Sequence, residues 1–226
     1  NCPAYAETSP VLSHPSIRDK VRIIPLGIDE KSYPSVGDSS VFNRIGILLQ
    51  EPFFLFLGVL RYYKGVHFLI RAAKSVGAKI VIAGDGPENK SLQALAEEIA
   101  ADNVIFAGRV TDAEKVALLK QCSALVLPSH LRSEAFGMVL VEAAMFGRPL
   151  ISCEIGTGTS YVNKNEETGF VVPPEDPASL AKAMQSLVDD SAVIDEIGRA
   201  ASLRYERLFS GEALGKAYAN LFKELV

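Results

Sequence analysis

The chain has 226 residues, of which 48% are hydrophobic and 22% charged, and its formal net charge is −4. This composition is typical of a globular protein with one large domain. The negative net charge excludes a general attraction to nucleic acid or to an anionic membrane, so a phosphate-bearing ligand must meet a few local cations. No apolar run approaches the roughly 20 residues that cross a membrane.

The cysteines are Cys2, Cys122 and Cys153, an odd number at wide spacing. They suggest neither a disulfide framework nor a zinc site, and we expect reduced thiols, with Cys122 and Cys153 packed in the core. We also expect no metal, no cofactor and a cytoplasmic location. The first residues do not form a signal peptide, because no basic segment precedes an apolar core. They also lack an initiator methionine, so we expect a piece of a longer protein.

Residues 1–50 are irregular and are interpreted as a hinge or connector with a remnant of a preceding domain; residues 21–26 predict one short strand that turns at Gly27. From Pro52 the pattern becomes regular. Strands are predicted at 53–57, 79–83, 103–107, 124–127, 149–152 and 169–172, and helices at 66–73, 88–101, 112–121 and 136–146. Helices then run from Pro177 to the end, with interruptions near Ser191 and Ser210.

Apolar strands that alternate with helices indicate a parallel sheet buried on both faces. The predicted fold is therefore α/β: a Rossmann-like, doubly wound parallel sheet over residues 51–209, followed by a C-terminal helix at 210–226. One face of that helix is apolar, with Leu214, Tyr218, Leu221, Phe222 and Leu225. In such a sheet ligands collect beyond the carboxyl ends of the strands, so functional residues should follow strands.

The segment after the first predicted strand carries two cations between two glycines. Arg61 and Lys64 lie between Gly58 and Gly65, at the entry of a helix, where they could clamp a diphosphate. A solvated turn with two surface cations is the alternative. The segment matches neither the Gly-Lys-Ser/Thr phosphate loop nor the Gly-x-Gly-x-x-Gly fingerprint, which counts against a kinase or a dehydrogenase.

Two further segments follow strands. Gly84, Asp85 and Gly86 come after the second strand, and these glycines would let a ligand approach the backbone closely, although a plain strand-to-helix turn explains them as well. The third strand ends before Val110, where backbone groups could pair with a base. Turn chemistry is again an equally good interpretation.

Residues 135–147 contain a single charged or polar side chain, that of Glu142. A helix that is apolar on all sides is predicted to be buried. Its carboxylate costs several kcal/mol unless a buried cation or the vicinal hydroxyls of a ligand satisfy it. Glu134 comes just before this helix, where Ser133 is a candidate cap and Gly137 leaves backbone amides accessible. Glu134 is explained either by the helix dipole or by a ligand.

These residues resemble one family. The pattern Ser-Glu-x-Phe-Gly-x-x-x-x-Glu-Ala, followed by Gly147-x-Pro149, is similar to the E-x7-E signature of GT-B glycosyltransferases of family 4. Residues 58–65 and 84–87 match other landmarks of that family in the same order. Residues 21–29 are similar to its hinge, and residues 168–176 to its closing stretch. The resemblance covers nearly all of the chain from about residue 21 and implies the C-terminal half of a GT-B fold.

The resemblance implies a retaining transfer from a nucleoside-diphosphate sugar to a saccharide or lipid-linked acceptor. A missing N-terminal domain would hold the acceptor, and the whole protein could touch a membrane surface. The loop at 156–161 resembles bacterial surface-polysaccharide mannosyltransferases, which favours GDP-mannose. The alternatives are a non-catalytic sugar-nucleotide module and a GT-B epimerase or phosphorylase. We expect this chain alone to bind nucleotide without transferring sugar.

By resemblance, Glu142 holds the ribose hydroxyls, Glu134 the sugar hydroxyls and Lys64 the diphosphate, with no metal. The family places an arginine directly after its first glycine, where this chain has Val59. Arg61 is predicted to reach the same phosphate in its place; the alternative is a clamp that rests mainly on Lys64. The implied catalytic residues are Glu134, Lys64 and Arg61. The implied donor-binding residues are Gly58, Gly84, Asp85, Gly86, Val110, Phe136, Gly137, Met138 and Glu142.

Overall fold

The computed structural model describes residues 2–48 and 50–225. Its centre is a six-stranded sheet in the order β3-β2-β1-β4-β5-β6, and every neighbouring pair is parallel. This order reverses between β1 and β4, which is the switch point of a doubly wound fold. The predicted Rossmann-like sheet is therefore confirmed. The strands are β1 (Phe53–Leu57), β2 (Lys79–Ala83), β3 (Val104–Gly108), β4 (Ala124–Leu127), β5 (Leu150–Cys153) and β6 (Gly169–Val172).

The strands are apolar runs because both faces of the sheet are covered. All five residues of β1 are buried, as are all four of β4. A strand exposed on one face would alternate between apolar and polar residues instead. The positions predicted for these six strands agree with the structure to within one residue.

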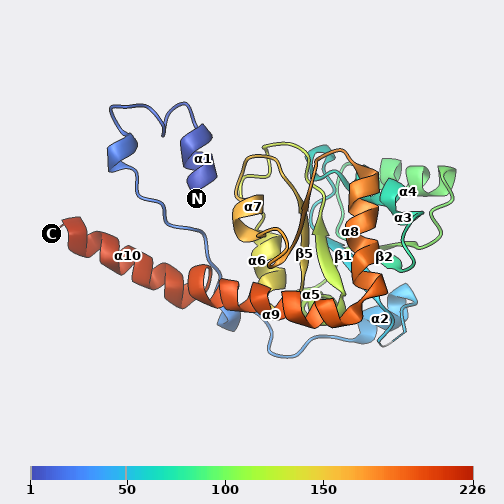
Figure 1. Ribbon diagram of the computed structural model, residues 1–226. Coiled ribbons are helices and arrows are strands. Elements are labelled where there is room, and N and C mark those ends of the chain that lie inside the picture. Colours follow the sequence, from blue (N-terminus) through green and yellow to red (C-terminus); the bar gives the residue numbers. More distant parts are fainter. Residues whose placement is uncertain (1, 49, 226) are drawn as a thin grey trace.

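Helices cover both faces of the sheet. One side carries α3 (Val66–Ala73), α4 (Asn89–Glu98) and α8 (Pro177–Asp189), and the other carries α6 (Met138–Met145) and α7 (Thr159–Val162), as Figure 1 shows. The helix α5 (Asp112–Gln121) connects β3 to β4, and α9 (Ser191–Leu208) packs against α6. The last helix is α10 (Gly211–Leu225), so the predicted interruptions near residues 191 and 210 are confirmed.

Two predicted helices are shorter than expected. The helix predicted at 88–101 is Asn89–Glu98, and the one predicted at 136–146 is Met138–Met145. The second begins late because Gly137 has a left-handed backbone, with φ 81° and ψ 57°, which a right-handed helix cannot include. Gly137 is thus the residue that precedes the helix. The predicted cap, Ser133, is wrong.

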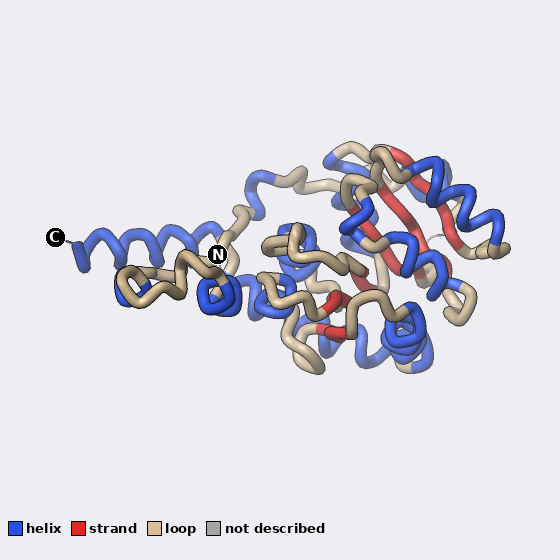
Figure 2. Tube along the Cα trace, turned by 90° about the horizontal axis from the view of Figure 1, so that it is seen from above, coloured by secondary structure: helices blue, strands red, loops and turns tan. Residues whose placement is uncertain are grey.

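The N-terminal segment contains α1 (Pro3–Thr8), α2 (Ser40–Ile45) and single 3-10 turns at Arg18–Lys20 and Glu30–Ser32. The strand predicted at 21–26 is wrong, because this apolar run has no sheet edge beside it; only Ile28 forms an isolated bridge, with Ser210. Figure 2 shows the beginning of the chain, which includes α1, and α10 extending from the sheet on the same side. There the Arg22 Nε and Glu224 Oε2 atoms are 3.6 Å apart. Within the described ranges, no helix has the length and apolar character needed to cross a membrane.

Candidate functional site

An open cavity of about 520 Å³ lies where β1 ends and α6 begins. Four of its lining side chains are charged, and they alternate in sign: two lysines from the loops and helices after β1 and β3, and two glutamates from the segment after β4. Strand ends that are far apart in sequence thus meet here, as a doubly wound sheet requires. The lining residues are Leu57, Gly58, Lys64, Lys115, Ser133, Glu134, Ala135, Phe136, Gly137, Met138, Val139 and Glu142.

Lys64 and Glu134 form the first charged pair. Lys64 ends the 3-10 turn η3 (Tyr62–Lys64), and its Nζ atom contacts Glu134 Oε2. The Ser129 hydroxyl donates to the same carboxylate oxygen at 3.2 Å. Both charged side chains are largely buried, with 13% and 11% of their surfaces exposed. Burial at this level strengthens the attraction between the two charges, and a carboxylate left here without its lysine would be costly.

Lys115 and Glu142 form the second pair. The Lys115 Nζ atom lies 3.2 Å from Glu142 Oε1 and 3.3 Å from Asp112 Oδ1. The Tyr33 hydroxyl donates to Glu142 Oε1 at 2.6 Å. Of the partners considered for the buried Glu142 carboxylate, the structure thus shows a lysine, joined by a tyrosine from the N-terminal segment.

Sequence reasoning did not find Lys115 or Tyr33. Lys115 had a usable signal: Thr111 and Glu114 form a capping box, which fixes the start of α5 directly after the end of β3. That start places the first turn of α5 at the ligand end of the sheet. Tyr33 had no such signal, because it lies in an irregular segment and follows no strand.

The start of α6 supplies uncharged donors. As the first amides of a helix, the N–H groups of Met138 and Val139 have no intrahelical acceptor. Both residues line the cavity beside Gly137, and the helix dipole adds partial positive charge at this end. The segment therefore brings Glu134, the α6 amides and Glu142 to one cavity, as the sequence predicts.

The predicted segment after β2, Gly84, Asp85 and Gly86, lies outside the cavity lining. A Cβ atom at Gly84 would lie 1.9 Å from the Gly58 carbonyl oxygen, and one at Gly86 would lie 2.4 Å from the Leu60 carbonyl oxygen. These glycines let the turn after β2 pack against the turn after β1, which supports the turn interpretation. Asp85 pairs with Arg109 at 3.3 Å across the same surface.

Arg61 and Val110 also lie outside the cavity lining, and the Arg61 side chain is exposed. Contacts of Arg61, Val110, Gly84, Asp85 and Gly86 with a donor stay predictions. Lys115, rather than Arg61, is the second cation that the described residues place at the cavity wall.

His130 lies under the turn that carries Lys64. It is 6% exposed, and neither of its ring nitrogens has a hydrogen-bond partner among the described residues. Burial lowers the pKa of His130 and of His67, whose ring lies 5.5 Å away. Tyr62 and Phe68 complete a packed group of four rings. Neutral histidines here act as packing residues.

Cys122 and Cys153 pack in the core, as predicted, and Cys2 is buried as well. Cys2, Cys122 and Cys153 are buried and free, and burial raises the pKa of the Cys122 and Cys153 thiols to about 12. A thiol with such a pKa is a poor nucleophile at neutral pH. In the part of the chain that the structure describes, no cluster of three or more His, Cys, Asp or Glu side chains is arranged to hold a metal ion.

Known proteins share this arrangement of segments. The family described as "Glycosyl transferases group 1" matches residues 39–204, which is well over half of the chain. The chain belongs to this family. Among its relatives, D-rhamnosyltransferase WbpZ of Pseudomonas aeruginosa is 47% identical over 92% of the chain, and O-antigen chain mannosyltransferase C of Escherichia coli is 38% identical over 99%. The chain spans 54% and 59% of the lengths of these two relatives.

Solved glycosyltransferase structures have the same fold. Sucrose-phosphate synthase from Thermosynechococcus elongatus is similar over 90% of this chain and 52% of its own, with a TM-score of 0.77 and 28% identity. A glycosyltransferase from Rickettsia africae is similar over 95% of this chain and 60% of its own, with a TM-score of 0.79 and 19% identity. The family match and these solved structures thus agree with the predicted Rossmann-like half of a GT-B fold.

Proposed function

We propose that this chain binds the sugar-nucleotide donor of a retaining glycosyltransferase, with GDP-mannose as the favoured donor. The observation that carries the proposal is one cavity in which two lysine–glutamate pairs flank the start of a buried helix. A sugar nucleotide offers the matching groups in a row: hydroxyls, a diphosphate, then hydroxyls again. In this proposal, residues 51–209 form the donor domain and residues 1–50 its hinge.

The names of the relatives support a manno-configured sugar. One is called a D-rhamnosyltransferase and the other an O-antigen chain mannosyltransferase. Rhamnose is 6-deoxymannose, so the two names refer to sugars that share a ring configuration. We therefore favour mannose or its 6-deoxy derivative as the transferred sugar, and a growing saccharide or lipid-linked saccharide of a surface polysaccharide as the acceptor.

Lys64 exchanges partners when the donor binds. In the structure its ammonium contacts Glu134. A diphosphate oxygen is a stronger partner, because it carries more charge and accepts a charge-assisted hydrogen bond. Once Lys64 turns to the phosphate, Glu134 is free to accept hydrogen bonds from the hydroxyls of the sugar. The amides of Met138 and Val139 then face the same phosphate.

At the other end of the donor, the Glu142 carboxylate accepts hydrogen bonds from the ribose hydroxyls. Its carboxylate is 16% exposed, so the low local dielectric strengthens each hydrogen bond that it accepts. Lys115 balances the charge of Glu142 before the donor binds and stays near the nucleoside afterwards.

The transfer itself breaks the bond between the sugar C1 atom and the diphosphate oxygen. An acceptor hydroxyl oxygen forms the new C1 bond on the same face of the sugar, and its proton passes to the departing phosphate oxygen. Negative charge grows on the leaving diphosphate, where the Lys64 ammonium and the α6 amides stabilise it. These groups supply the charge that a divalent metal supplies elsewhere.

Calorimetry with the 226-residue chain tests the proposal, with GDP, UDP, GDP-mannose and UDP-glucose as probes. We expect GDP and GDP-mannose to bind in the micromolar range and the uridine compounds to bind more weakly. Preference for the uridine compounds would overturn the choice of GDP-mannose while leaving donor binding in place. Failure of all four to bind at millimolar concentration would overturn the proposed function.

A further inference from the structure

Tyr33 links the N-terminal segment to the candidate site. It directly follows the 3-10 turn at Glu30–Ser32, and its hydroxyl donates to Glu142 Oε1 at 2.6 Å across 109 residues of sequence. Burial, followed by the hydrogen bond to Glu142, raises the pKa of Tyr33 far above its ordinary value of 10. The hydroxyl is therefore protonated at neutral pH and serves as a donor.

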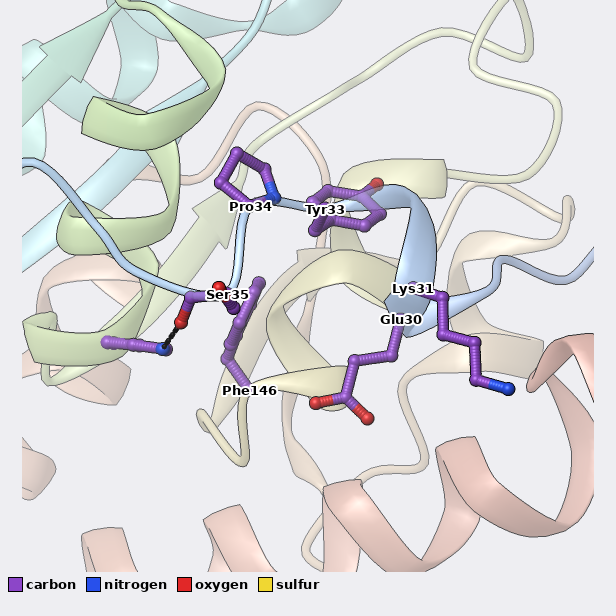
Figure 3. Close-up of a pocket in the computed structure, with 7 residues that line it drawn as sticks. Glu30, Lys31, Tyr33, Pro34, Ser35 and Phe146 are labelled. Atoms are coloured by element: carbon purple, nitrogen blue, oxygen red, sulfur yellow. Dashed lines mark hydrogen bonds between the residues drawn. The ribbon is translucent and has the colours of Figure 1, made fainter.

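Tyr33 approaches Glu142 from behind the candidate site. Tyr33 is absent from the lining of the site cavity and instead lines a second cavity of about 460 Å³. That cavity lies on the hinge side, and Figure 3 shows the Tyr33 hydroxyl pointing away from Glu30 and Phe146. The residues that line the second cavity are Glu30, Lys31, Tyr33, Pro34, Ser35, Lys120 and Phe146.

The tyrosine ring is held on several sides. Its edge packs on Phe146, with ring centroids 6.2 Å apart, and the Lys115 Nζ atom lies 4.7 Å from its centroid. The Lys120 Nζ atom donates to the Ser35 carbonyl oxygen at 3.2 Å and fixes the segment that follows Tyr33. A side chain held in this way can orient its partner, because its own freedom is already restricted.

Both protein donors use the same oxygen of Glu142. The Tyr33 hydroxyl and the Lys115 ammonium contact Oε1, and within residues 2–48 and 50–225 no hydrogen bond reaches Oε2. A carboxylate has about four acceptor positions, so two partners on one oxygen leave the other oxygen available. Because Glu142 lines the site cavity, a ligand there can use the oxygen that Tyr33 and Lys115 leave available.

We propose that Tyr33 is a positioning residue, which fixes the Glu142 carboxylate so that its second oxygen meets the ribose hydroxyls of the donor. This inference rests on the proposed function and deepens it, because it assigns binding of the ribose to Glu142 together with Tyr33. It also means that binding of the ribose depends on the position of the segment around residues 28–35.

The test compares Tyr33→Phe, which removes one hydroxyl, with the wild-type chain. Calorimetry measures the affinities for GDP and for 2′,3′-dideoxy-GDP, which lacks both ribose hydroxyls. We expect the wild-type chain to prefer GDP by about tenfold or more, as is typical of hydrogen bonds to a charged group. Tyr33→Phe should lower this preference about threefold to tenfold and leave the dideoxy affinity unchanged, whereas general damage would weaken both nucleotides alike.

Two variants serve as controls. Glu142→Gln should remove most of the preference for GDP. Tyr205→Phe removes a hinge contact of the same kind, since the Tyr205 hydroxyl donates to the Ile28 carbonyl oxygen at 3.1 Å without touching Glu142, and it should keep the wild-type preference.

An unchanged preference in Tyr33→Phe, with normal binding by the wild-type chain, overturns the inference alone. An equal loss of the preference for GDP in Tyr205→Phe also overturns the inference, because the position of the hinge segment as a whole would then be responsible. Absence of GDP binding by the wild-type chain overturns the proposed function and this inference together.

Discussion

Two lysines and two glutamates at one cavity neutralise each other pairwise. Lys64 contacts Glu134, and Lys115 contacts Glu142, all four side chains being less than one fifth exposed. Buried pairs of this kind contribute little net stability, because desolvation offsets the attraction. In the proposed function the pairs hold these groups in place before the donor binds: Lys64 then meets the diphosphate, and the two carboxylates meet hydroxyls.

Lys64→Met should therefore weaken GDP binding by at least tenfold, because the diphosphate loses a charge-assisted partner worth roughly 1.5–3 kcal/mol. Calorimetry of the folded variant checks this. Lys90→Met removes an exposed cation of α4 and should bind GDP as the wild type does.

Arg61→Met belongs in the same series, since the sequence predicts a role for Arg61 at the diphosphate. A tenfold loss there would confirm that role despite the exposed position of Arg61. Wild-type affinity in Lys64→Met would contradict the assignment of Lys64.

The packed histidines give the stability a pH dependence. Burial lowers the pKa of His67 and His130 in the folded chain, although the nearby Glu175 carboxylate opposes this lowering at both. The unfolded chain then binds more protons near and below pH 6.5, so the contribution of these residues is present above that pH and is lost as the pH falls.

His130→Phe should flatten the loss of stability between pH 7 and pH 5, because a phenyl ring keeps the packing and cannot take up a proton. Urea unfolding at several pH values measures the slope. His14→Phe is the matched control, since His14 is exposed, and it should leave the slope unchanged. A slope for His130→Phe as steep as that of the wild type would contradict the prediction.

At the site, the sequence predicted the residues that follow strands and missed those that only folding brings close. A lone carboxylate in an apolar helix indicated that Glu142 needs a partner. The partners were missed, because Lys115 and Tyr33 lie 27 and 109 residues away; only Lys115 had a signal, in the capping box that fixes the start of α5. The role of Gly84 and Gly86 was ambiguous, because glycine is favoured both where two backbones pack closely and where a ligand approaches the backbone.

At the scale of elements, the turns after β1 and β2 behave as one unit. Gly84 has φ 142°, and a Cβ atom there would lie 1.9 Å from the Gly58 carbonyl oxygen. We expect Gly84→Ala to lower the free energy of unfolding by at least about 2 kcal/mol, because strain and overlap add.

Urea unfolding checks this, with Gly215→Ala in α10 as the control. Among the described residues, no heavy atom beyond the adjacent residues and the backbone of α10 itself lies within 4 Å of a Cβ atom at Gly215, so alanine there should be neutral or stabilise the helix by up to about 1 kcal/mol. Equal stability of Gly84→Ala and the wild type would show that the two turns can separate freely.

The elements themselves were largely predictable, since runs such as Phe53–Leu57 are too apolar for any place but a covered sheet. The failures have local causes. Residues 21–26 form a similar run without a neighbouring strand to pair with, and Ile23 and Leu26 are 40% and 48% exposed. The start of α6 shifted because its glycine takes a left-handed backbone, a choice that the pattern of apolar residues does not reveal.

At the scale of the whole molecule, donor binding should stabilise the fold. At a GDP concentration of 100 times Kd, the free energy of unfolding rises by about 2.7 kcal/mol. For a domain of this size the Tm should rise by roughly 5–10 °C. A thermal melt with and without GDP measures this. A chelator such as EDTA should leave the shift unchanged, since in the proposed function Lys64 and the α6 amides, without a metal, meet the diphosphate. A shift that EDTA abolishes would contradict the role given to these groups.

The pairing of Lys64 with Glu134 and of Lys115 with Glu142 also bears on how fast a donor arrives. A resting cavity whose formal charges cancel, in a chain of net charge −4, projects little positive potential into solution. In the proposed function an anionic nucleotide should therefore reach the cavity by diffusion without electrostatic steering, and Lys64 should leave Glu134 only when the nucleotide makes contact. We expect an association rate constant that does not increase as the salt concentration falls, in contrast to electrostatically steered binding. Stopped-flow mixing with a fluorescent GDP analogue at several ionic strengths measures this dependence, and a steep acceleration at low salt would mean that the lysines are already free before the donor arrives.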